Sequence, residues 1–308
     1  MTELLKPPAL RPNATIGVAA LSGPVDADRL ARGISHLRQK GYRIVEAANL
    51  RKRSGFLAGS DEERASGYRE LLRDPAVDAI FFARGGYGSS RTLSRLDPAE
   101  AMRHPKIHLG ASDLTALFAF LYCHARLATF YGPMVALEMG EDGNLDWESL
   151  LSGSVPERHR FADPDIVAQG TGEGPLIGGC LSLLASLCGT PEALDARGAI
   201  LFWEDIGEET YRIDRLLTQL ERSGTLANLQ GMVIGSVLPG GRDQTPEQIR
   251  QSLQDRLRGA PFPVALSFPA GHLPRPRTLP LGARVRLDLR DKDTRELVFL
   301  EAGVSVAR

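Results

Sequence analysis

Residues 106–122, KIHLGASDLTALFAFLY, join a short apolar strand to an apolar helix through a brief turn. The first five residues have the length and composition of a short strand. Residues 114–122 are apolar on nearly every side of a helix and include neither Gly nor Pro, a pattern typical of a buried helix. A strand followed directly by a buried helix predicts an α/β domain, with Ser112 at the turn between the two elements.

A serine at such a turn is compatible with two roles. The turn lifts the Ser112 hydroxyl above the edge of the sheet and directs the first N–H groups of the helix toward whatever the hydroxyl attacks, and those donors suit an oxyanion. Serine is also a common N-cap, which would make Ser112 structural. Leu114 stands where the second glycine of the hydrolase pattern Gly-x-Ser-x-Gly would be, so this stretch alone leaves nucleophile and cap open.

The rest of the first half alternates apolar strand patterns with helical patterns. Strands are predicted at 15–20, 43–46, 79–83 and 129–131, and helices from about Asp28 to Gly41 and from the capping box that begins at Ser60 to about Arg73. Such alternation is the signature of a parallel sheet covered by helices. We therefore expect an N-terminal parallel-sheet domain of the flavodoxin-like class over residues 1–140.

The second half of the chain shows a different pattern. Residues 141–174 lose regular periodicity and carry several Gly, Pro and acidic residues, which predicts a linker. Beyond it we expect a helix at 176–188, strands at 199–203, 232–238, 264–268, 284–289 and 296–300, and a hairpin turn at 290–294. Residues 175–308 are therefore expected to form a mixed, strand-rich and barrel-like domain.

Composition and charge exclude several classes of protein. The 308 residues include 37 Lys and Arg against 38 Asp and Glu, a net charge of −1 that gives no electrostatic footprint for nucleic acid or an anionic membrane. No apolar run reaches the ~18 residues of a membrane span, and the first residues lack a signal-peptide core, so we expect a cytoplasmic protein. The three cysteines form no Cys-x-x-Cys pair, which argues against a disulfide framework or a zinc site.

A glycine-rich loop at residues 84–90, RGGYGSS, follows directly on the strand predicted at 79–83. Ligands of open α/β sheets usually bind next to the carboxyl ends of the strands. The loop lacks the Gly-x-Lys-Ser/Thr and Gly-x-Gly-x-x-Gly patterns of phosphate-binding loops, so nucleotide binding is weakly supported. The alternatives are a structural loop, or an oxyanion hole formed by an amide of Gly85 or Gly86 and the amide of Asp113.

A serine nucleophile requires a base and a carboxylate, and the second half of the chain offers candidates for both. Among six histidines, His272 is distinctive because it lies in a turn, AGHLP, that follows a predicted strand. Glu204 and Asp205 end a very apolar strand, where charges seldom occur without a partner. Either carboxylate is a candidate to orient the imidazole, and both are also compatible with capping the following helix.

These segments resemble the serine LD-carboxypeptidases, a family that also contains the microcin C self-immunity hydrolases. The resemblance extends over most of the chain and rests on ordered motifs: SGP at 22–24, AGSDEER at 58–64, RGGYG at 84–88, GASDLTAL at 110–117, YGP at 131–133, GGCL at 178–181, GTP at 189–191, ED at 204–205, GH at 271–272 and TLPLG at 278–282. Two positions depart from the family pattern, since Ala111 stands where a bulkier residue such as Tyr is frequent and Cys180 where Asn is frequent.

The resemblance implies a Ser–Glu–His triad assembled from both domains. In it Ser112 is the nucleophile, His272 is the general base and then the acid, and Glu204 orients the imidazole. For such a reaction the candidate oxyanion-hole residues are Gly86 and Asp113, through their amides, and the candidate substrate contacts are Arg84, Gly85 and Tyr87. Arg84 is the candidate for a terminal carboxylate, and a solvent-facing side chain is its alternative. No metal or organic cofactor is implied, and the expected assembly is a homodimer.

The reaction best known for the family removes the terminal D-alanine from a murein tetrapeptide during peptidoglycan recycling. It cuts an LD bond through an acyl-enzyme, and it is the leading hypothesis for this chain. One alternative is a microcin C-type self-immunity amidase, which cleaves the amide between a peptidyl or aminoacyl group and a nucleotide. A second alternative is a non-catalytic peptide-binding module on the same scaffold.

Overall fold

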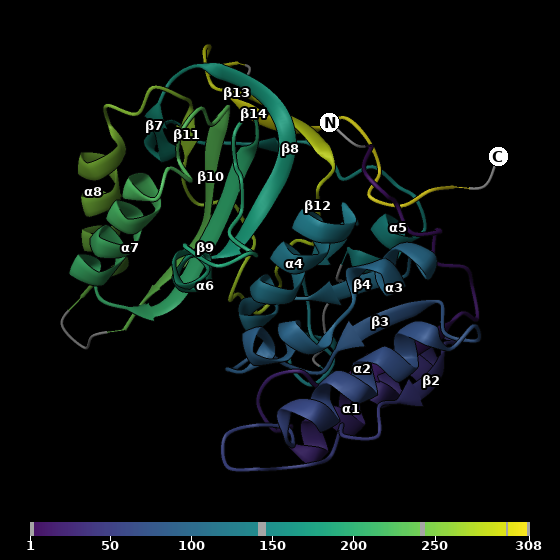
Figure 1. Cartoon of the computed structure of the whole chain (residues 1–308). Coiled ribbons are helices and arrows are strands. Elements are labelled where there is room, and N and C mark those ends of the chain that lie inside the picture. The colour runs from purple at the N-terminus through teal and green to yellow at the C-terminus, as the bar shows by residue number, and fades with distance from the viewer. Residues whose placement is uncertain (1–2, 141–145, 241–243, 294, 307–308) are drawn as a thin grey trace. The chain divides into compact units, whose positions relative to one another are not determined.

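The computed structural model describes residues 3–140, 146–240, 244–293 and 295–306. The chain divides into two compact units, called unit 1 and unit 2 (Figure 1). Unit 1 consists of Met1–Ser154, Pro274–Pro280 and Ala302–Arg308, and unit 2 of Val155–Leu273 and Leu281–Glu301. The chain therefore enters each unit more than once.

Unit 1 is built on a six-stranded sheet in the order β12-β5-β4-β3-β1-β2. Its strands are β1 (Thr15–Ala19), β2 (Arg43–Glu46), β3 (Ala79–Phe82), β4 (Ile107–Gly110), β5 (Thr129–Tyr131) and β12 (Leu279–Leu281). The first five pair in parallel in the order 2-1-3-4-5, which is the flavodoxin-like arrangement. The predicted N-terminal parallel-sheet fold is confirmed.

The helices of unit 1 connect these strands. They are α1 (Ala27–Gln39), α2 (Asp61–Arg73), α3 (Pro98–Arg103), α4 (Thr115–Ala125) and α5 (Trp147–Leu151), with 3₁₀ segments η1 (Ser89–Arg95), η2 (Ser112–Leu114) and η3 (Glu138–Gly140). The predicted capping box starts α2, because the Ser60 side chain accepts from the Glu63 amide and the Glu63 side chain accepts from the Ser60 amide. Nearly every residue of α4 is buried, as its apolar sequence predicted.

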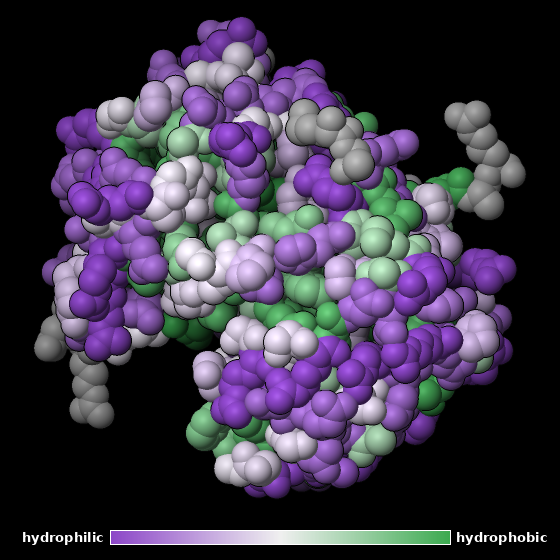
Figure 2. Space-filling view, viewed as in Figure 1, coloured by the Kyte–Doolittle hydropathy of each residue, from purple (hydrophilic) through white to green (hydrophobic). Residues whose placement is uncertain are grey.

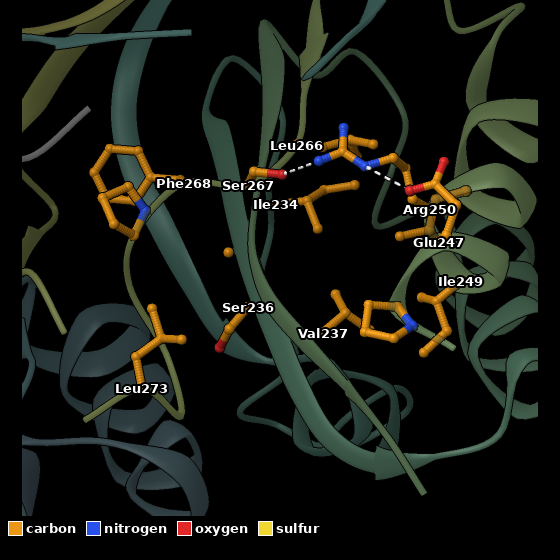
Figure 3. Close-up of a pocket in the computed structure, with 14 residues that line it drawn as sticks. Ile234, Ser236, Val237, Glu247, Ile249, Arg250, Leu266, Ser267, Phe268 and Leu273 are labelled. Atoms are coloured by element: carbon orange, nitrogen blue, oxygen red, sulfur yellow. Dashed lines mark hydrogen bonds and ion pairs between the residues drawn. The ribbon is translucent and has the colours of Figure 1, made fainter. Parts of the chain in front are cut away.

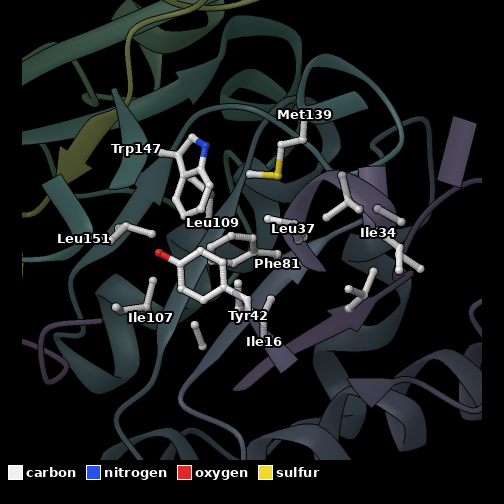
Figure 4. Packing of buried hydrophobic residues seen from close by; sticks show 14 of the residues in the cluster. Ile16, Ile34, Leu37, Tyr42, Phe81, Ile107, Leu109, Met139, Trp147 and Leu151 are labelled. Atoms are coloured by element: carbon white, nitrogen blue, oxygen red, sulfur yellow. The ribbon is translucent and has the colours of Figure 1, made fainter. Parts of the chain in front are cut away.

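The sheet of unit 1 is buried on both faces. On one face, a cluster of apolar side chains joins the strands to α1 and α5 (Figure 4), with members that include Ile16, Leu37, Phe81, Leu109 and Trp147. Phe81 and Trp147 meet edge to face, with ring centroids 5.3 Å apart. On the other face, Phe82 contacts Tyr68 of α2 and Phe118 of α4. Burial on both sides explains why β3, for example, is continuously apolar rather than alternating, whereas the edge strand β2 is partly exposed and begins and ends with charged residues.

Unit 2 is built on a curled, mixed sheet in the order β6-β14-β13-β8-β9-β10-β11-β7 (Figure 1). Its strands are β6 (His159–Arg160), β7 (Ile166–Ala168), β8 (Thr171–Cys180), β9 (Ile200–Glu208), β10 (Gly231–Pro239), β11 (Val264–Ala265), β13 (Arg284–Asp288) and β14 (Glu296–Phe299). The central strands β8 to β11 pair in parallel, and the outer strands pair antiparallel. The predicted strand-rich, mixed and barrel-like C-terminal fold is confirmed.

Unit 2 also contains α6 (Leu181–Ser186), α7 (Thr210–Arg222), α8 (Pro246–Leu257) and the 3₁₀ segment η4 (Asp163–Asp165). Figure 1 shows α7 and α8 on one side of the sheet. Both are amphipathic, since α7 buries Ile213, Leu217 and Leu220 while its other positions are mostly polar. Hydrophilic residues cover the outward faces of α7 and α8, and those of α1 and α2 in unit 1, in the view of Figure 2.

The helix predicted at 176–188 is wrong, because residues 171–180 form β8 and only 181–186 are helical. Gly178 and Gly179 both have positive φ, +138° and +150°. A Cβ at Gly178 would lie 1.7 Å from the Phe202 carbonyl oxygen of β9. Glycine therefore allows the two strands to approach each other closely. A run of small apolar residues is also typical of a packed helix, and for this reason the sequence pattern predicts a helix here. Likewise β11 is shorter than the strand predicted at 264–268, since Ser267 turns into the left-handed region at φ +60°.

The division into units differs from the linker expected at 141–174. In that segment α5 belongs to unit 1, whereas β6, η4, β7 and the first residues of β8 belong to unit 2. Residues 141–145 lie outside the described residues. β13 and β14 pair antiparallel, as expected for a hairpin, but the predicted turn at 290–294 includes Thr294, which also lies outside them.

Candidate active site

Ser112 lies in unit 1 at the start of η2, directly after β4. Its φ of +61° is in the left-handed region, which disfavours any residue with a Cβ. The residue is half-buried. The N-cap of η2 is Ala111 and that of α4 is Leu114, so Ser112 is not a helix cap. A hydroxyl carried on a strained turn is the feature expected of a presented nucleophile.

Two hydrogen bonds hold the main chain of this turn. The Ser112 amide donates to the Tyr131 hydroxyl at 2.9 Å, and the Thr115 hydroxyl donates to the Ser112 carbonyl at 2.7 Å. The sequence predicts Tyr131 as part of a strand and of the YGP motif that resembles the family, but it does not predict this contact with Ser112. The Ser112 amide is therefore occupied, and the next amide along the chain, that of Asp113, is the first one at the helix start that can serve another acceptor.

The glycine loop comes close to Ser112 at Gly85. A Cβ added at Gly85 would lie 2.9 Å from Ser112 Cβ, 3.1 Å from Ser112 Oγ and 3.3 Å from the Asp113 amide nitrogen. Glycine at this position therefore keeps open a space that touches both the hydroxyl and the Asp113 N–H. A carbonyl attacked by Ser112 would have to enter such a space.

The remaining loop residues differ in how they are engaged. Gly86 has φ +117°, so it also needs glycine. Arg84 Nε donates to the Gly85 carbonyl at 3.2 Å, and its Nη1 donates to the Pro24 carbonyl at 3.3 Å. Tyr87 is 52% exposed, and its ring lies 5.8 Å from that of the exposed Phe56. Arg84 thus braces the loop, whereas Tyr87 presents an aromatic face to solvent.

Unit 2 brings Glu204 and His272 together. Glu204 lies in β9 and is fully buried, and its Oε2 accepts from His272 Nδ1 at 2.7 Å and from the His272 amide at 3.1 Å. The imidazole is 22% exposed. With Nδ1 directed at the carboxylate, Nε2 is the ring nitrogen that can exchange a proton with a reacting group.

The turn that carries His272 is built for this contact. Gly271 has φ +108°, and a Cβ there would lie 2.5 Å from Ser236 Oγ and 2.6 Å from Glu204 Oε2. Gly235 of β10 is equally confined, since a Cβ would lie 2.5 Å from the Ala270 carbonyl oxygen. The two glycines allow the turn to approach β9 and β10 closely enough for the carboxylate to receive both N–H groups.

Asp205 points elsewhere, as the alternation of side chains along a strand requires. It is buried, and its carboxylate accepts from the Ser182 amide at 2.7 Å and from the Ile206 amide at 2.8 Å. Burial raises the pKa of Asp205 to about 6, against the hydrogen bond from Ser182. Of the two neighbouring acids, Glu204 contacts the imidazole and Asp205 holds the start of α6. Neither caps α7, whose N-cap is Glu209.

Cys180 ends β8 opposite Glu204 in the strand register. Its side chain is buried, and Sγ lies 3.2 Å from Ser182 Oγ. Burial, with the nearby Asp205 and Glu204 carboxylates, raises the pKa of the Cys180 thiol. The thiol is therefore neutral at ordinary pH and, unlike an asparagine at the same place, supplies no strong hydrogen-bond donor.

A cavity of about 410 Å³ opens in unit 2 next to Leu273, which follows the imidazole in the chain (Figure 3). Most of its lining side chains are apolar and come from β10, α8 and residues 266–273. Arg250 lines it too, but Nη1 donates to Asp165 at 2.8 Å and Nη2 to Ser267 at 2.9 Å. The cavity thus offers apolar contact, and its guanidinium is already paired with a carboxylate.

The described residues contain no group of three or more His, Cys, Asp or Glu side chains arranged to hold a metal ion. None of their helices combines the length and apolar character that a membrane span requires.

Both halves of the chain match a known family. Residues 16–132 match the LD-carboxypeptidase N-terminal domain, and residues 173–287 match the LD-carboxypeptidase C-terminal domain. A probable murein peptide carboxypeptidase of Bacillus subtilis is 34% identical over 97% of this chain and 95% of its own length.

Solved structures agree with these matches. The muramoyltetrapeptide carboxypeptidase of Oxalobacter formigenes is 30% identical, with a TM-score of 0.80 over 92% of this chain and 97% of that one. The microcin C7 self-immunity protein MccF, solved in complex with glutamyl sulfamoyl guanosine, is 26% identical, with a TM-score of 0.86 over 98% of this chain and 100% of that one; the MccF sequence is that of Escherichia coli. The chain belongs to the LD-carboxypeptidase family.

Proposed function

We propose that the protein is a serine carboxypeptidase that removes the C-terminal D-alanine from murein tetrapeptide. The observation that carries the proposal is the Glu204–His272 pair, in which a buried carboxylate accepts a hydrogen bond from Nδ1 and so orients the imidazole, with Nε2 as the proposed catalytic nitrogen. Ser112, on its strained turn, is the proposed nucleophile. The Bacillus and Oxalobacter proteins, whose names describe murein peptide and muramoyltetrapeptide carboxypeptidases, support the choice of substrate.

The proposed reaction proceeds through an acyl-enzyme. Ser112 Oγ attacks the carbonyl carbon of the bond to D-alanine while its proton passes to His272 Nε2, and the carbonyl electrons move to the oxygen. The tetrahedral intermediate collapses, the C–N bond breaks, and His272 returns the proton to the departing amine of D-alanine. Water then attacks the ester with His272 as base, which releases the shortened peptide and restores the serine.

The amides of Gly86 and Asp113 are the proposed donors to the oxyanion. Gly85 supports this assignment because its missing side chain keeps open the space between Ser112 Oγ and the Asp113 N–H. Arg84 and Tyr87 are the proposed substrate contacts, and Arg84 would have to bind the terminal carboxylate with donors beyond those it gives to Gly85 and Pro24. From the resemblance we also propose a cytoplasmic homodimer, which cell fractionation and sedimentation measure.

Product analysis tests the proposal. The protein is incubated with the tetrapeptide L-Ala-γ-D-Glu-meso-diaminopimelate-D-Ala, and free D-alanine and the tripeptide are measured by mass spectrometry. We expect both products in equal amounts, none from the analogue that ends in L-alanine, and none from Ser112→Ala. Hydroxylamine added during turnover should yield the tripeptide hydroxamate, since it competes with water for the acyl-enzyme. Turnover by Ser112→Ala, or its absence in the wild type, would refute the proposal.

The structural match to MccF supports one other reaction, cleavage of an amide between an aminoacyl group and a nucleotide. A glutamyl sulfamoyl nucleoside incubated under the same conditions tests it. Release of glutamate with no D-alanine from the tetrapeptide would favour this amidase. Binding of either compound without any product would favour the non-catalytic peptide-binding module.

A further inference from the structure

A buried arginine connects two loops of unit 1. Arg64 lies in α2, and its side chain is fully buried. Its Nη1 donates to the main-chain carbonyls of Leu21 and Gly88, the latter at 2.7 Å. Its Nη2 donates to the Asp61 carboxylate, which fixes the plane of the guanidinium. One side chain thus joins the loop after β1 to the glycine loop after β3.

The residues that follow these two carbonyls both donate to Asp113. Ser22 Oγ donates to Asp113 Oδ2 at 2.5 Å, and the Ser89 amide donates to the same oxygen at 2.8 Å. The Ser89 hydroxyl donates to the Asp113 carbonyl. All three residues are buried, and Asp113 directly follows Ser112. The carboxylate therefore ties both loops to the turn of the proposed nucleophile.

Gly88 shows how tightly the arginine is fitted. It has φ +128°, and a Cβ there would lie 2.5 Å from Leu57 Cδ2 and 3.0 Å from Arg64 Nη1. A side chain at this position would separate the loop from the guanidinium. A lysine could replace Arg64 only in part, because its single ammonium lacks the planar fork that reaches two carbonyls and a carboxylate together.

Charge is also balanced in this cluster. Asp113 directly follows Ser112, whose Oγ would form the ester of the acyl-enzyme. The negative charge of the Asp113 carboxylate would disfavour an oxyanion formed nearby. Donors from Ser22 and Ser89 disperse that charge. Burial lowers the pKa of the Arg64 guanidinium, and the Asp61 and Asp113 carboxylates oppose this shift, so the side chain remains a cation.

We propose that Arg64 and Asp113 are positioning residues, which together hold the Ser112 turn and the Gly85–Gly86 amides in the geometry that acyl transfer requires. The proposal rests on the proposed function, because it takes Ser112 as the nucleophile. It also explains the AGSDEER motif at 58–64. Its capping box starts α2, Asp61 orients the guanidinium, and Arg64 holds the two loops.

The test compares Arg64→Met and Arg64→Lys with Arg91→Met. Arg91 also pairs with Asp61, at 3.0 Å, but its side chain is 43% exposed and its described contacts include neither loop carbonyl. Two quantities are measured: kcat and KM for D-alanine release, and the rate at which a fluorophosphonate labels Ser112. We expect Arg64→Met to lower kcat and the labelling rate by about 100-fold with KM little changed, because displacement of reacting groups by about 1 Å has such an effect.

Arg64→Lys should recover part of both rates, and Arg91→Met should match the wild type. Wild-type kcat and labelling in a folded Arg64→Met protein would overturn the proposal. If circular dichroism shows that Arg64→Met does not fold, Ser22→Ala and Ser89→Ala replace it. Each removes one hydroxyl donor to Asp113 and should slow labelling about tenfold, as loss of one buried hydrogen bond predicts; wild-type rates in both would overturn the proposal.

Labelling of the wild type separates this inference from the proposed function. If the wild type releases D-alanine but the reagent labels another residue, Ser112 is not the nucleophile, and both proposals fail. If the reagent labels Ser112 and the Arg64 and serine variants react normally, only the positioning role fails.

Discussion

The strained backbone of Ser112 predicts different stabilities for two variants that both lack the hydroxyl. At φ +61°, a residue with a Cβ is disfavoured by about 1–2 kcal/mol. Glycine avoids this penalty but loses about 0.5–1 kcal/mol more conformational free energy on folding than alanine. Ser112→Gly should therefore be more stable than Ser112→Ala by about 0.5–1 kcal/mol. At a residue with ordinary helical backbone the order is reversed.

The two tryptophans allow unit 1 to be followed separately. Trp147 lies in the core of unit 1 and Trp203 in β9 of unit 2, and the chain has no others. In a Trp203→Phe background, fluorescence during urea unfolding therefore reports the unit that contains Ser112. We would measure the difference in the free energy of unfolding between the Gly and Ala variants. The two transitions are comparable if the free energy of unfolding falls with urea concentration at the same slope in both variants.

Ser66 in α2 is the matched control, because it belongs to the same unit and has helical backbone. There Ser66→Gly should be less stable than Ser66→Ala by about 1 kcal/mol. The reasoning predicts opposite signs at the two positions. If Ser112→Gly is also the less stable variant, the turn does not hold Ser112 in the left-handed region, and the argument that the fold presents it under strain is refuted.

Three further predictions concern the contacts of the site. Glu204→Gln should fold but lose about 10⁴ in kcat, because an amide favours the wrong imidazole tautomer, whereas Asp205→Asn should retain activity; equal losses in a D-alanine assay would contradict this assignment. Gly85→Ala should lower the rate at which the fluorophosphonate labels Ser112, since the added Cβ would lie 3.1 Å from Ser112 Oγ, while the protein still folds with a clear thermal unfolding transition. Unchanged labelling would show that this space is not used. The pKa of Asp205 is raised to about 6 in the folded protein, so the folded state keeps a proton that the unfolded chain has already lost between about pH 4 and pH 6. The stabilising contribution of this carboxyl group is therefore present below pH 4 and is lost as the pH rises through 6. Relative to Asp205→Asn, the wild type should therefore lose on the order of 3 kcal/mol of unfolding free energy between pH 4 and pH 7, and a constant difference would refute it.

The sequence predicts the fold best where hydrophobic runs and helix caps are local. Strands β1 to β5 of unit 1 and the Ser60–Glu63 capping box appear where their patterns indicate. The sequence does not predict β8 because Gly178 allows the strand to approach its neighbour closely, and small apolar residues look the same in a packed helix. It does not predict β12 either, since three residues with no periodicity join the unit 1 sheet only through long-range pairing.

For the site, residue types could be predicted but not their partners. His272 and Glu204 were recognisable as a base and a buried acid, yet the choice between Glu204 and Asp205 needs the strand register. The residues before them in β9 are buried throughout, so no alternation in the sequence shows which face each acid takes. The carboxylate role of Asp113 was missed for a similar reason, because its donors are 24 and 91 residues away in the chain.

Each unit organises its part of the proposed triad in the same way. In unit 1 the buried Asp113 carboxylate accepts hydrogen bonds from a hydroxyl and an amide N–H of two loops. In unit 2 the buried Glu204 carboxylate accepts hydrogen bonds from an amide N–H and an imidazole N–H of one turn. In Asp113 both donors reach Oδ2, whereas the buried Oδ1 has no hydrogen-bond partner among the described residues. Loss of either donor would leave a buried carboxylate still less satisfied, which is costly, so each arrangement depends on both of its donors. Each half is therefore preorganised within its own unit.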